Sequence, residues 1–160
     1  MRKKIISVVC FLLAVFVSHG IAADSASFFF LQLSDPQFGF MDNNKSISAE
    51  TEAMNKAVTA INQLKPPFVV ITGDFVNNSK SKEQIAAYKS MIAQIDSSVK
   101  VYMIPGNHDI GKVSRASIDN YKKNYGEPHF SFRYGDCAFI GIDSNIIKEE
   151  DKEREEVQFK

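Results

Sequence analysis

Apolar and polar positions follow one another along this chain in blocks that predict strands and helices in turn. Three short apolar runs, at 28–33, 68–72 and 99–104, have the length and composition of buried strands. Proline or glycine closes each run, and both residues interrupt regular strands. Between the runs, apolar residues return every three or four positions, the spacing of a helix with one buried face. The β-α-β-α-β order predicts a layered α/β domain with parallel strands at its centre.

Local capping signals indicate where the helices begin and end. Ser48 is a candidate N-cap for the first helix, and Pro66-Pro67 ends it. Ser81 and Gln84 form the Ser-x-x-Gln pattern of a capping box at the start of the second helix. A third helix is predicted around 117–125. The first two helices therefore fill the two connections between the predicted parallel strands.

The second half of the chain predicts a hairpin. The runs 129–134 and 137–142 are strand-like, and Gly135-Asp136 between them suits a tight turn. Cys137 lies in the second run and is predicted to be a buried core residue rather than a reactive thiol. The charged stretch 148–156 is predicted to form the solvated face of a helix.

The first 23 residues have the three-part form of a secretory signal peptide. A basic start precedes an apolar run at 5–17, and small residues follow around Ala22. The competing interpretation is an uncleaved anchor, but a spanning helix needs about 20 apolar residues and this run is shorter. We therefore expect export to the periplasm or the medium. We also expect no stable membrane anchor after cleavage and one mature domain over 24–160.

Charge is balanced over the whole chain, with 19 basic and 19 acidic residues. The predicted signal peptide contains Arg2, Lys3 and Lys4 and no acid, so the remaining domain is mildly acidic. It has no basic stripe of the kind on which electrostatic binding of nucleic acid depends. We therefore predict no nucleic-acid partner, whereas a small phosphorylated substrate is compatible with this charge.

Polar side chains follow each of the three predicted parallel strands at its carboxyl end. The groups are Asp35-Pro36-Gln37, Gly73-Asp74-Phe75-Val76-Asn77 and Gly106-Asn107-His108-Asp109. Ligands of open α/β sheets bind outside the carboxyl ends of the strands, so the three groups are expected at one crevice. Carboxylate and amide oxygens suit Mg, Mn or Fe, and imidazole also admits Zn. The pattern predicts a site for divalent cations.

Each group also has a purely structural interpretation. Asp35 with Pro36 is ordinary turn chemistry, Gly73-Asp74 can simply end a strand, and the run from Asn107 can cap a following helix. However, Gly-Asn-His-Asp should occur by chance in roughly one chain of this length in a thousand, at average residue frequencies. Three such groups, in order at three strand ends, favour a metal site over coincidence.

The three groups resemble the first three motifs of the calcineurin-like metallophosphoesterases. The resemblance extends over about 28–145 and includes Gly-Ile-Asp-Ser at 141–144, which is similar to the family's strand after the third motif. It implies the family's α/β fold of two mixed sheets flanked by helices. It also implies hydrolysis of phosphoester bonds with two divalent metal ions, drawn from Mn, Fe, Zn and Mg.

The resemblance also implies a role for each site residue. Asp35 and Gln37 would bind one metal ion, Asp74 would bridge both, and Asn107 would bind the second. His108 would be the catalytic group that faces the leaving oxygen of the substrate and protonates or stabilises it. Two further residues would orient that imidazole: Asn77 and Asp109.

The sequence departs from the family pattern in two respects. Gln37 stands where the wider family has histidine, as in a subgroup whose opening motif is Asp-Pro-Gln, and its amide replaces a strong nitrogen donor. The family completes its site with histidines in two later motifs, which this chain lacks. His129 has no such setting and is interpreted as structural. We therefore expect only the N-terminal part of the domain, truncated at its C-terminus.

Two functions of different classes follow from these residues. The first is a metal-dependent phosphatase or phosphodiesterase that acts on a phosphorylated small molecule or a phosphoprotein. The alternative is a non-catalytic relative that holds metal or phosphate, or an inactive fragment. His108 favours the enzyme, because a pure binding site has little use for a proton donor beside metal ions. The early end of the chain favours the alternative for this polypeptide by itself.

Overall fold

The structure, a computed structural model, describes residues 27–149 and 152–159. The signal peptide predicted at 1–23 lies outside these residues. Among the helices that the structure describes, none is both long enough and apolar enough to cross a membrane.

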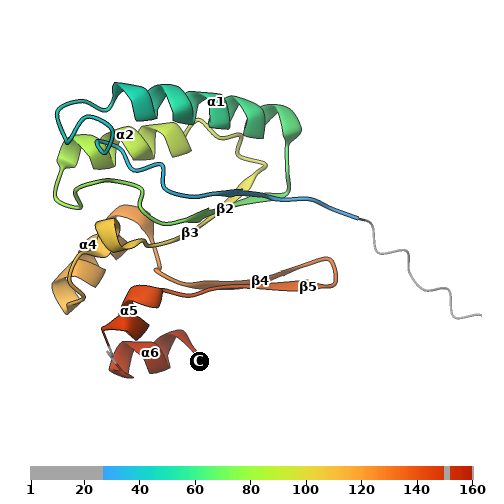
Figure 1. Cartoon of the computed structure of the whole chain (residues 1–160). Helices are drawn as coiled ribbons and strands as arrows, with labels where there is room; N and C mark the ends of the chain where they lie inside the picture. The colour runs from blue at the N-terminus through green and yellow to red at the C-terminus, as the bar shows by residue number, and fades with distance from the viewer. Residues whose placement is uncertain (1–26, 150–151, 160) are drawn as a thin grey trace, which may run out of the picture.

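A sheet of three parallel strands forms the centre of the fold. Its order is β1 (Leu31–Leu33), β2 (Phe68–Thr72) and β3 (Lys100–Ile104), with β2 in the middle. In the register, Ile71 pairs with Leu33 on one side and with Met103 on the other. The predicted α/β arrangement with parallel strands is therefore confirmed (Figure 1).

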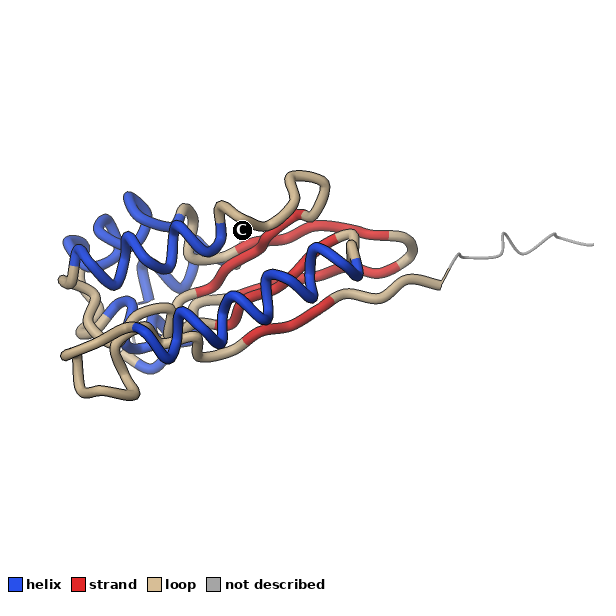
Figure 2. Tube along the Cα trace, turned by 90° about the horizontal axis from the view of Figure 1, so that it is seen from above, coloured by secondary structure: helices blue, strands red, loops and turns tan. Residues whose placement is uncertain are grey.

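Two helices, α1 (Ser48–Leu64) and α2 (Lys82–Ile92), cover one face of this sheet (Figures 1 and 2). The apolar stripe of α1 faces inward because Met54, Val58 and Ile61 recur at helical spacing, and all three are buried. The two predicted crossover helices are thus confirmed, and their polar faces remain toward solvent.

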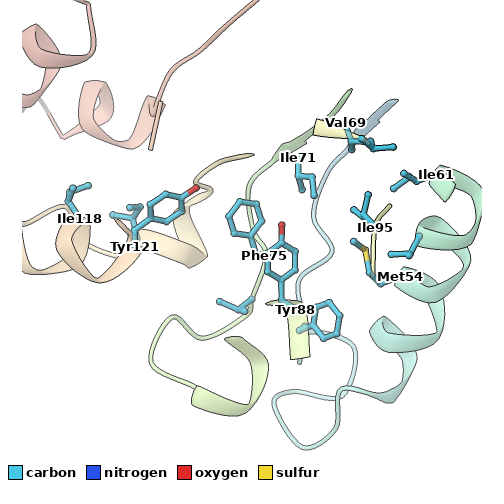
Figure 3. Close-up of a cluster of buried hydrophobic side chains, with 14 of the residues drawn as sticks. Met54, Ile61, Val69, Ile71, Phe75, Tyr88, Ile95, Ile118 and Tyr121 are labelled. Carbon is cyan, nitrogen blue, oxygen red and sulfur yellow. The ribbon is translucent and has the colours of Figure 1, made fainter. Parts of the chain in front are cut away.

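Aliphatic side chains together with stacked aromatic rings form the hydrophobic core of the described residues (Figure 3). Phe75, just after β2, stacks on Tyr88 of α2 with ring centroids 4.7 Å apart. Tyr121 lies 6.1 Å from Phe75 between ring centroids and extends the core. Because Phe75 directly follows Asp74, burial of its ring fixes the loop on which that carboxylate lies.

The two ends of α1 differ in how well the sequence predicted them. Ser48 is not the N-cap but the first helical residue, and its N–H donates to the Ser46 Oγ at 3.2 Å. Ile47 takes the cap position without a side-chain hydrogen bond. At the other end, Lys65 has a left-handed backbone with φ 47° and donates its N–H to the Ile61 carbonyl at 2.8 Å. The helix therefore ends just before the two prolines, as predicted.

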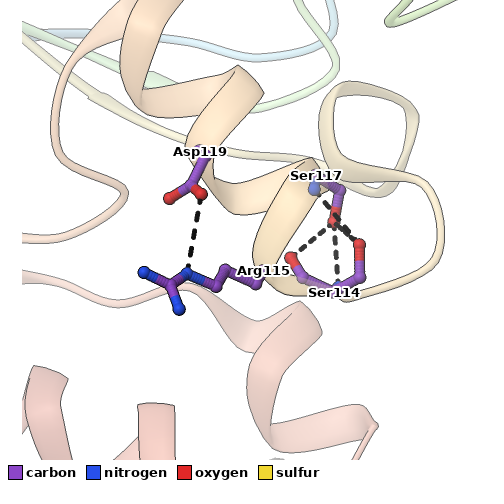
Figure 4. A network of polar contacts seen from close by, with 4 residues as sticks. All are labelled: Ser114, Arg115, Ser117 and Asp119. Carbon is purple, nitrogen blue, oxygen red and sulfur yellow. Dashed lines mark hydrogen bonds and ion pairs between the residues drawn. The ribbon is translucent and has the colours of Figure 1, made fainter.

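After β3 the chain forms a short helix, α3 (Asn107–Ile110), and then α4 (Arg115–Tyr125). The third predicted helix is confirmed and begins two residues before 117, because Ser114 caps it and accepts the Ser117 N–H at 3.1 Å (Figure 4). On its exposed side, Arg115 and Asp119 form an ion pair of 3.9 Å.

The predicted hairpin is also confirmed. Strands β4 (Phe130–Tyr134) and β5 (Cys137–Gly141) pair antiparallel across Gly135-Asp136 and lie on the sheet face opposite α1 and α2 (Figure 1). Helices α5 (Ser144–Lys148) and α6 (Lys152–Gln158) follow. Within the charged stretch predicted at 148–156, residues 152–156 belong to α6.

Stacked rings join the hairpin to the parallel sheet. Phe68 of β2 is 1% exposed, and its ring centroid lies 5.0 Å from that of Phe132 and 4.9 Å from that of Phe139. Tyr102 of β3 stacks on Phe132 at 3.8 Å between centroids. The opposite face of the hairpin is open, with Ile140 72% exposed.

Two sequence predictions about the strands need correction. The first strand begins at Leu31 rather than at 28, because Phe28 and Phe30 direct their rings to Phe139 of the hairpin and lie outside the ladder. Cys137 is exposed rather than buried, because it lies beside the hairpin turn on a two-stranded sheet. In the described residues, one sheet is parallel and the other is antiparallel.

Candidate metal centre

The loops that follow β1 and β2 run side by side at the carboxyl edge of the parallel sheet. The Asp35 N–H donates to the Gly73 carbonyl at 3.2 Å, and the Gln37 N–H donates to the Asp74 carbonyl at 2.8 Å. A further parallel bridge joins Phe38 to Val76. The structure therefore brings together the first two polar groups that the sequence singled out.

Three of the candidate ligands have an unusual backbone conformation. Asp35, Gln37 and Asp74 lie at φ 55°, 33° and 48°, in the left-handed region. Side-chain-bearing residues adopt such angles at a cost of about 1–3 kcal/mol each, and such residues cluster at functional sites. The paired loops hold these angles through the inter-loop hydrogen bonds and the buried rings of Phe38 and Phe75.

The ends of β2 and β3 lie directly against each other at two glycines. A Cβ on Gly73 would collide with the backbone of Gly106, and a Cβ on Gly106 would collide with Asp74. The Asp74 carboxylate then accepts the His108 N–H at 2.9 Å through its Oδ1. These contacts place the first turn of α3, with Asn107 at its start, beside the other two groups.

Asp109 acts on the backbone rather than on the imidazole. Its Oδ1 accepts the N–H groups of Phe75 and Val76 at 2.8 and 3.3 Å, and its Oδ2 accepts that of Gly106 at 2.9 Å. Its side chain is buried, and burial raises its pKa to about 7 against the opposing effect of these three amides, with the Asp74 charge raising it further. The predicted contact with the His108 ring does not occur among the hydrogen bonds of the described residues.

The His108 ring is held by a main-chain group. Its Nδ1 lies 3.0 Å from the carbonyl oxygen of Asn77. A carbonyl oxygen only accepts, so Nδ1 is the donor in this hydrogen bond and carries a proton. Asn77 therefore contacts the His108 ring through its backbone carbonyl.

The Asn77 side chain belongs to a polar network that the sequence analysis did not detect. Its Oδ1 accepts from Gln37 Nε2 at 3.4 Å, and its Nδ2 donates to Asn44 Oδ1 at 2.9 Å. Gln84, which is 3% exposed, donates to the same Asn44 oxygen at 2.8 Å and accepts the Asn78 N–H at 2.8 Å.

The capping box predicted at Gln84 is therefore half correct. Its N–H donates to Ser81 Oγ at 3.3 Å, but its side chain supports the site loops instead. Its place on the buried side of α2 is the signal that could have identified this role, because buried amides need hydrogen-bond partners.

The donor chemistry of the site fits a hard divalent cation, although the number of strong ligands is small. Asp35 and Asp74 offer carboxylate oxygens, and Gln37 and Asn107 offer amide oxygens, which suit Mg or Mn. Asp35 and Asn107 are exposed, and Gln37 and Asp74 are partly buried. In the described part of the chain, no group of three or more His, Cys, Asp or Glu residues is placed to hold a metal ion.

His129 lies away from these strand ends, just before β4. It is partly buried, and its charge acts on Asp143, the buried residue that caps α5. Desolvation raises the pKa of Asp143, while Asn145 and the His129 charge oppose that rise. The structure thus places His129 beside a buried carboxyl group and not among the candidate ligands.

Comparison with known proteins supports the family resemblance of the sequence motifs. Residues 30–153 match the family described as Calcineurin-like phosphoesterase. Serine/threonine-protein phosphatase CPPED1 from Homo sapiens is 29% identical over 156 residues, covering 88% of this chain and 50% of that protein. The Bos taurus protein of the same name is 32% identical over 136 residues, covering 75% and 44%.

A further relative is named for a different activity. The probable glycerophosphodiester phosphodiesterase GpdQ from Arcobacter nitrofigilis is 31% identical over 99 residues, covering 59% of this chain and 35% of that protein. The chain spans about half the length, or less, of the curated relatives it matches.

Proposed function

The chain belongs to the calcineurin-like phosphoesterase family, and we propose that it hydrolyses phosphoester bonds with divalent metal ions. The observation that carries this proposal is the junction at Asp74. Its backbone joins the loop of Asp35 and Gln37, and its carboxylate accepts the His108 N–H at 2.9 Å. Candidate metal ligands and a candidate proton donor are thus linked through one residue.

Two metal ions would be held by the oxygen donors of the three strand-end groups. Asp35 and Gln37 would bind the first, Asp74 would be shared, and Asn107 would bind the second. Bound divalent ions would supply Lewis acidity to the phosphoryl group. The left-handed backbone angles at Asp35, Gln37 and Asp74 support this assignment, because strain of this kind is retained where a site requires it.

His108 would handle the proton of the leaving group. Its Nδ1 proton is fixed on the Asn77 carbonyl, so Nε2 is the nitrogen available to protonate a leaving oxygen. The Asp109 carboxylate keeps the backbones of Phe75 and Gly106 together and so maintains the distance between His108 and Asp74. In this role Asp109 positions the site without touching the substrate.

We favour a phosphomonoester as substrate, in a phosphoprotein or a small molecule. The similarity to proteins named as serine/threonine-protein phosphatases covers more of the chain than the similarity to the named phosphodiesterase. The Gln37 in the opening motif supports a place in the Asp-Pro-Gln subgroup. Residues 1–23 support a proposal of export through a cleaved signal peptide.

Metal content tests the first half of the proposal. Asp74→Asn keeps an acceptor for the His108 N–H but removes the shared negative charge, so the purified variant should lose one or both equivalents of manganese. Asp136→Asn, at the hairpin turn, is the matched control and should keep them. Unchanged manganese content in Asp74→Asn would disprove the assignment.

The role of His108 is tested by the choice of leaving group. His108→Ala should lower turnover of an alkyl phosphate by about 10²–10⁴-fold while metal content is retained. An aryl phosphate needs less help from a proton donor and should be affected less. Equal losses on both substrates would show a positioning role instead.

The competing function is a relative that binds metal or phosphate without turnover. The small number of strong ligands among the described residues favours it. Retained manganese binding without hydrolysis of any phosphoester, in the protein and in His108→Ala alike, would support this alternative.

A further inference from the structure

A groove with a cationic lining opens beside the candidate metal centre. It has a volume of about 790 Å³ and lies between the loop after β2, the start of α2, the α3–α4 connection and α4. Its four charged residues are all lysines: Lys80, Lys82, Lys112 and Lys123. No Asp or Glu is found among the described residues that line it. A mildly acidic domain thus has a local concentration of positive charge on one side of the site.

The charges of these lysines are not neutralised by neighbouring carboxylates. All four are exposed, and none is in an ion pair within the part of the chain that the structure describes. Other cations of α4 are paired, since Arg115 contacts Asp119 and Lys122 contacts Glu127 at 2.8 Å. Unpaired charges of one sign in a groove attract ligands of the opposite sign.

Hydrogen bonds order the wall of the groove that follows β2. The Asn78 Oδ1 accepts the Lys80 N–H at 3.0 Å, and the buried Gln84 accepts the Asn78 N–H at 2.8 Å. Asn120 of α4 donates to the Ser79 carbonyl at 3.4 Å and so connects this wall to the other. The backbones that carry the lysines are therefore fixed, while the long side chains can adapt.

The opposite wall is fixed in the same way. The Ser117 Oγ accepts the Ser114 N–H at 2.9 Å (Figure 4). It also donates to the Lys112 carbonyl at 2.9 Å. These bonds pin the connection between α3 and α4 against the first turn of α4. Lys112 is held at the rim of the groove by this contact.

Both walls start from segments that contact His108. Ser79 comes two residues after Asn77, whose carbonyl holds the imidazole. Ile110 and Gly111 line the other side and directly follow the turn that contains His108. A substrate with its phosphoryl group at the candidate centre would therefore have its neighbouring atoms close to the groove.

We propose that this groove binds acidic residues of a phosphopeptide, with the phosphoryl group placed at the candidate centre. The placement of the phosphoryl group at the candidate centre rests on the proposed function, whereas the binding of acidic residues does not. Four lysines distributed over two walls suit a ligand with several separated negative charges. The substrate class is therefore a phosphorylated protein segment rich in Asp and Glu.

Binding is tested without any need for catalysis. The probe is a fluorescent peptide of alternating Glu and Ser residues without phosphate, and its affinity is measured by anisotropy at low salt. Lys112→Gln/Lys123→Gln should weaken binding about tenfold, and the weakening should diminish as salt rises. The matched control is Lys89→Gln/Lys100→Gln, which changes the same charge elsewhere and should stay within about twofold. Equal effects of both double variants would overturn the proposal.

Hydrolysis gives the second measurement. With two phosphopeptides that differ only in Glu or Gln flanks, Lys112→Gln/Lys123→Gln should raise KM about tenfold for the acidic one and leave kcat unchanged. KM for the neutral peptide and for an aryl phosphate should not change, and Lys112→Arg/Lys123→Arg should restore affinity. Equal changes for both peptides would refute the groove as a specificity element.

The two proposals fail in distinguishable ways. Lysine-dependent peptide binding without hydrolysis of any substrate would refute the proposed function and support the groove. Hydrolysis with no preference between the two peptides would support the function and refute the groove. A single-stranded oligonucleotide of equal charge that displaces the acidic peptide more strongly than a second acidic peptide does would refute the peptide assignment.

Discussion

Strands β2 and β5 are both five-residue apolar segments, yet their surroundings differ. β2 pairs on both edges, has helices on one face and hairpin rings on the other, and contains three fully buried side chains. β5 pairs only with β4 and exposes Cys137 and Ile140. An apolar run thus predicts a strand, whereas burial depends on how many layers and neighbours the strand acquires. Asp74, the candidate ligand shared by both metal ions, follows the strand that is covered on both faces.

The first way to test this comparison is to remove the ring that joins the two regions. Phe68→Ala should lower the free energy of unfolding by about 3–5 kcal/mol, because a fully buried aromatic side chain leaves a cavity between the sheet and the hairpin. Ile140→Ala on the open face should cost less than about 0.5 kcal/mol. Urea unfolding of both variants gives the comparison, and similar losses would show that the hairpin face is covered in solution.

A smaller effect is expected from a methyl group at the closest backbone approach. Gly106→Ala would push Asp74 away and should cost about 3 kcal/mol. Gly135→Ala, in the hairpin turn at φ 56°, meets only the edge of the Phe28 ring and should cost about 1 kcal/mol.

Manganese binding separates these two glycine variants. It should weaken in Gly106→Ala and remain in Gly135→Ala. A Gly106→Ala protein with full stability and full metal content would contradict the geometry of the site.

Replacing the buried carboxylate of Asp109 should have the next largest effect on stability. In Asp109→Asn one of its two acceptor oxygens becomes a donor, so an amide of Phe75, Val76 or Gly106 loses its partner. The expected loss is about 1–2 kcal/mol in the free energy of unfolding. Thermal unfolding measures this loss. The control in the hairpin is Asp136→Asn, at an exposed position, and its free energy of unfolding should stay within about 0.5 kcal/mol of the parent value. Equal stability of both variants would mean that the three N–H bonds contribute nothing net.

The smallest effect concerns Asp143, where the chain leaves the hairpin. Burial raises its pKa, so the folded state holds this proton more tightly than the unfolded state. Its contribution to stability is therefore present below about pH 4, the ordinary value, and is lost as the pH rises through the folded pKa.

The variant that tests this effect is Asp143→Asn. Its Oδ1 can still cap α5, and it should be as stable as the parent or up to about 1 kcal/mol more stable at neutral pH. Its unfolding midpoint should change less between pH 4 and pH 7 than that of the parent. An unaltered pH profile would show that Asp143 does not titrate in this range.

Much of the fold could be predicted from periodicity. The bounds 68–72 of β2 coincide with the prediction, and the hairpin turn at Gly135-Asp136 follows from local chemistry. Residues that are close together along the chain determine both features, so local sequence patterns are enough to predict them. The exposure of Cys137 could not be predicted, since it depends on which layer covers a surface.

The candidate site likewise has features that the sequence could predict and features that it could not. Parallel strands place their carboxyl ends at one edge, so the proximity of Asp35, Asp74 and Asn107 followed from strand order alone. The role of Asp109 could not be predicted, because two of its three partners are the backbone amides of Phe75 and Val76, more than 30 positions away along the chain. The lysine groove was missed for a similar reason: Lys82 and Lys123 come together only through the packing of α2 and α4.

The hydrogen bond from His108 to the Asn77 carbonyl has a practical consequence for mutational scanning. Every amino acid at position 77 carries the same carbonyl group, so a scan of that position reports on the side-chain network and is blind to the atom that sets the imidazole tautomer. The position of this carbonyl oxygen is set by the path of the main chain and not by any side chain. Semisynthesis could reach it, because an ester in place of the amide between 77 and 78 weakens the carbonyl as an acceptor. The ester also removes the Asn78 N–H that Gln84 accepts, so Gln84→Met is the control for that loss. A catalytic defect in the ester analogue, with Asn77→Ala and Gln84→Met active, would identify a dependence that no genetic substitution can reveal.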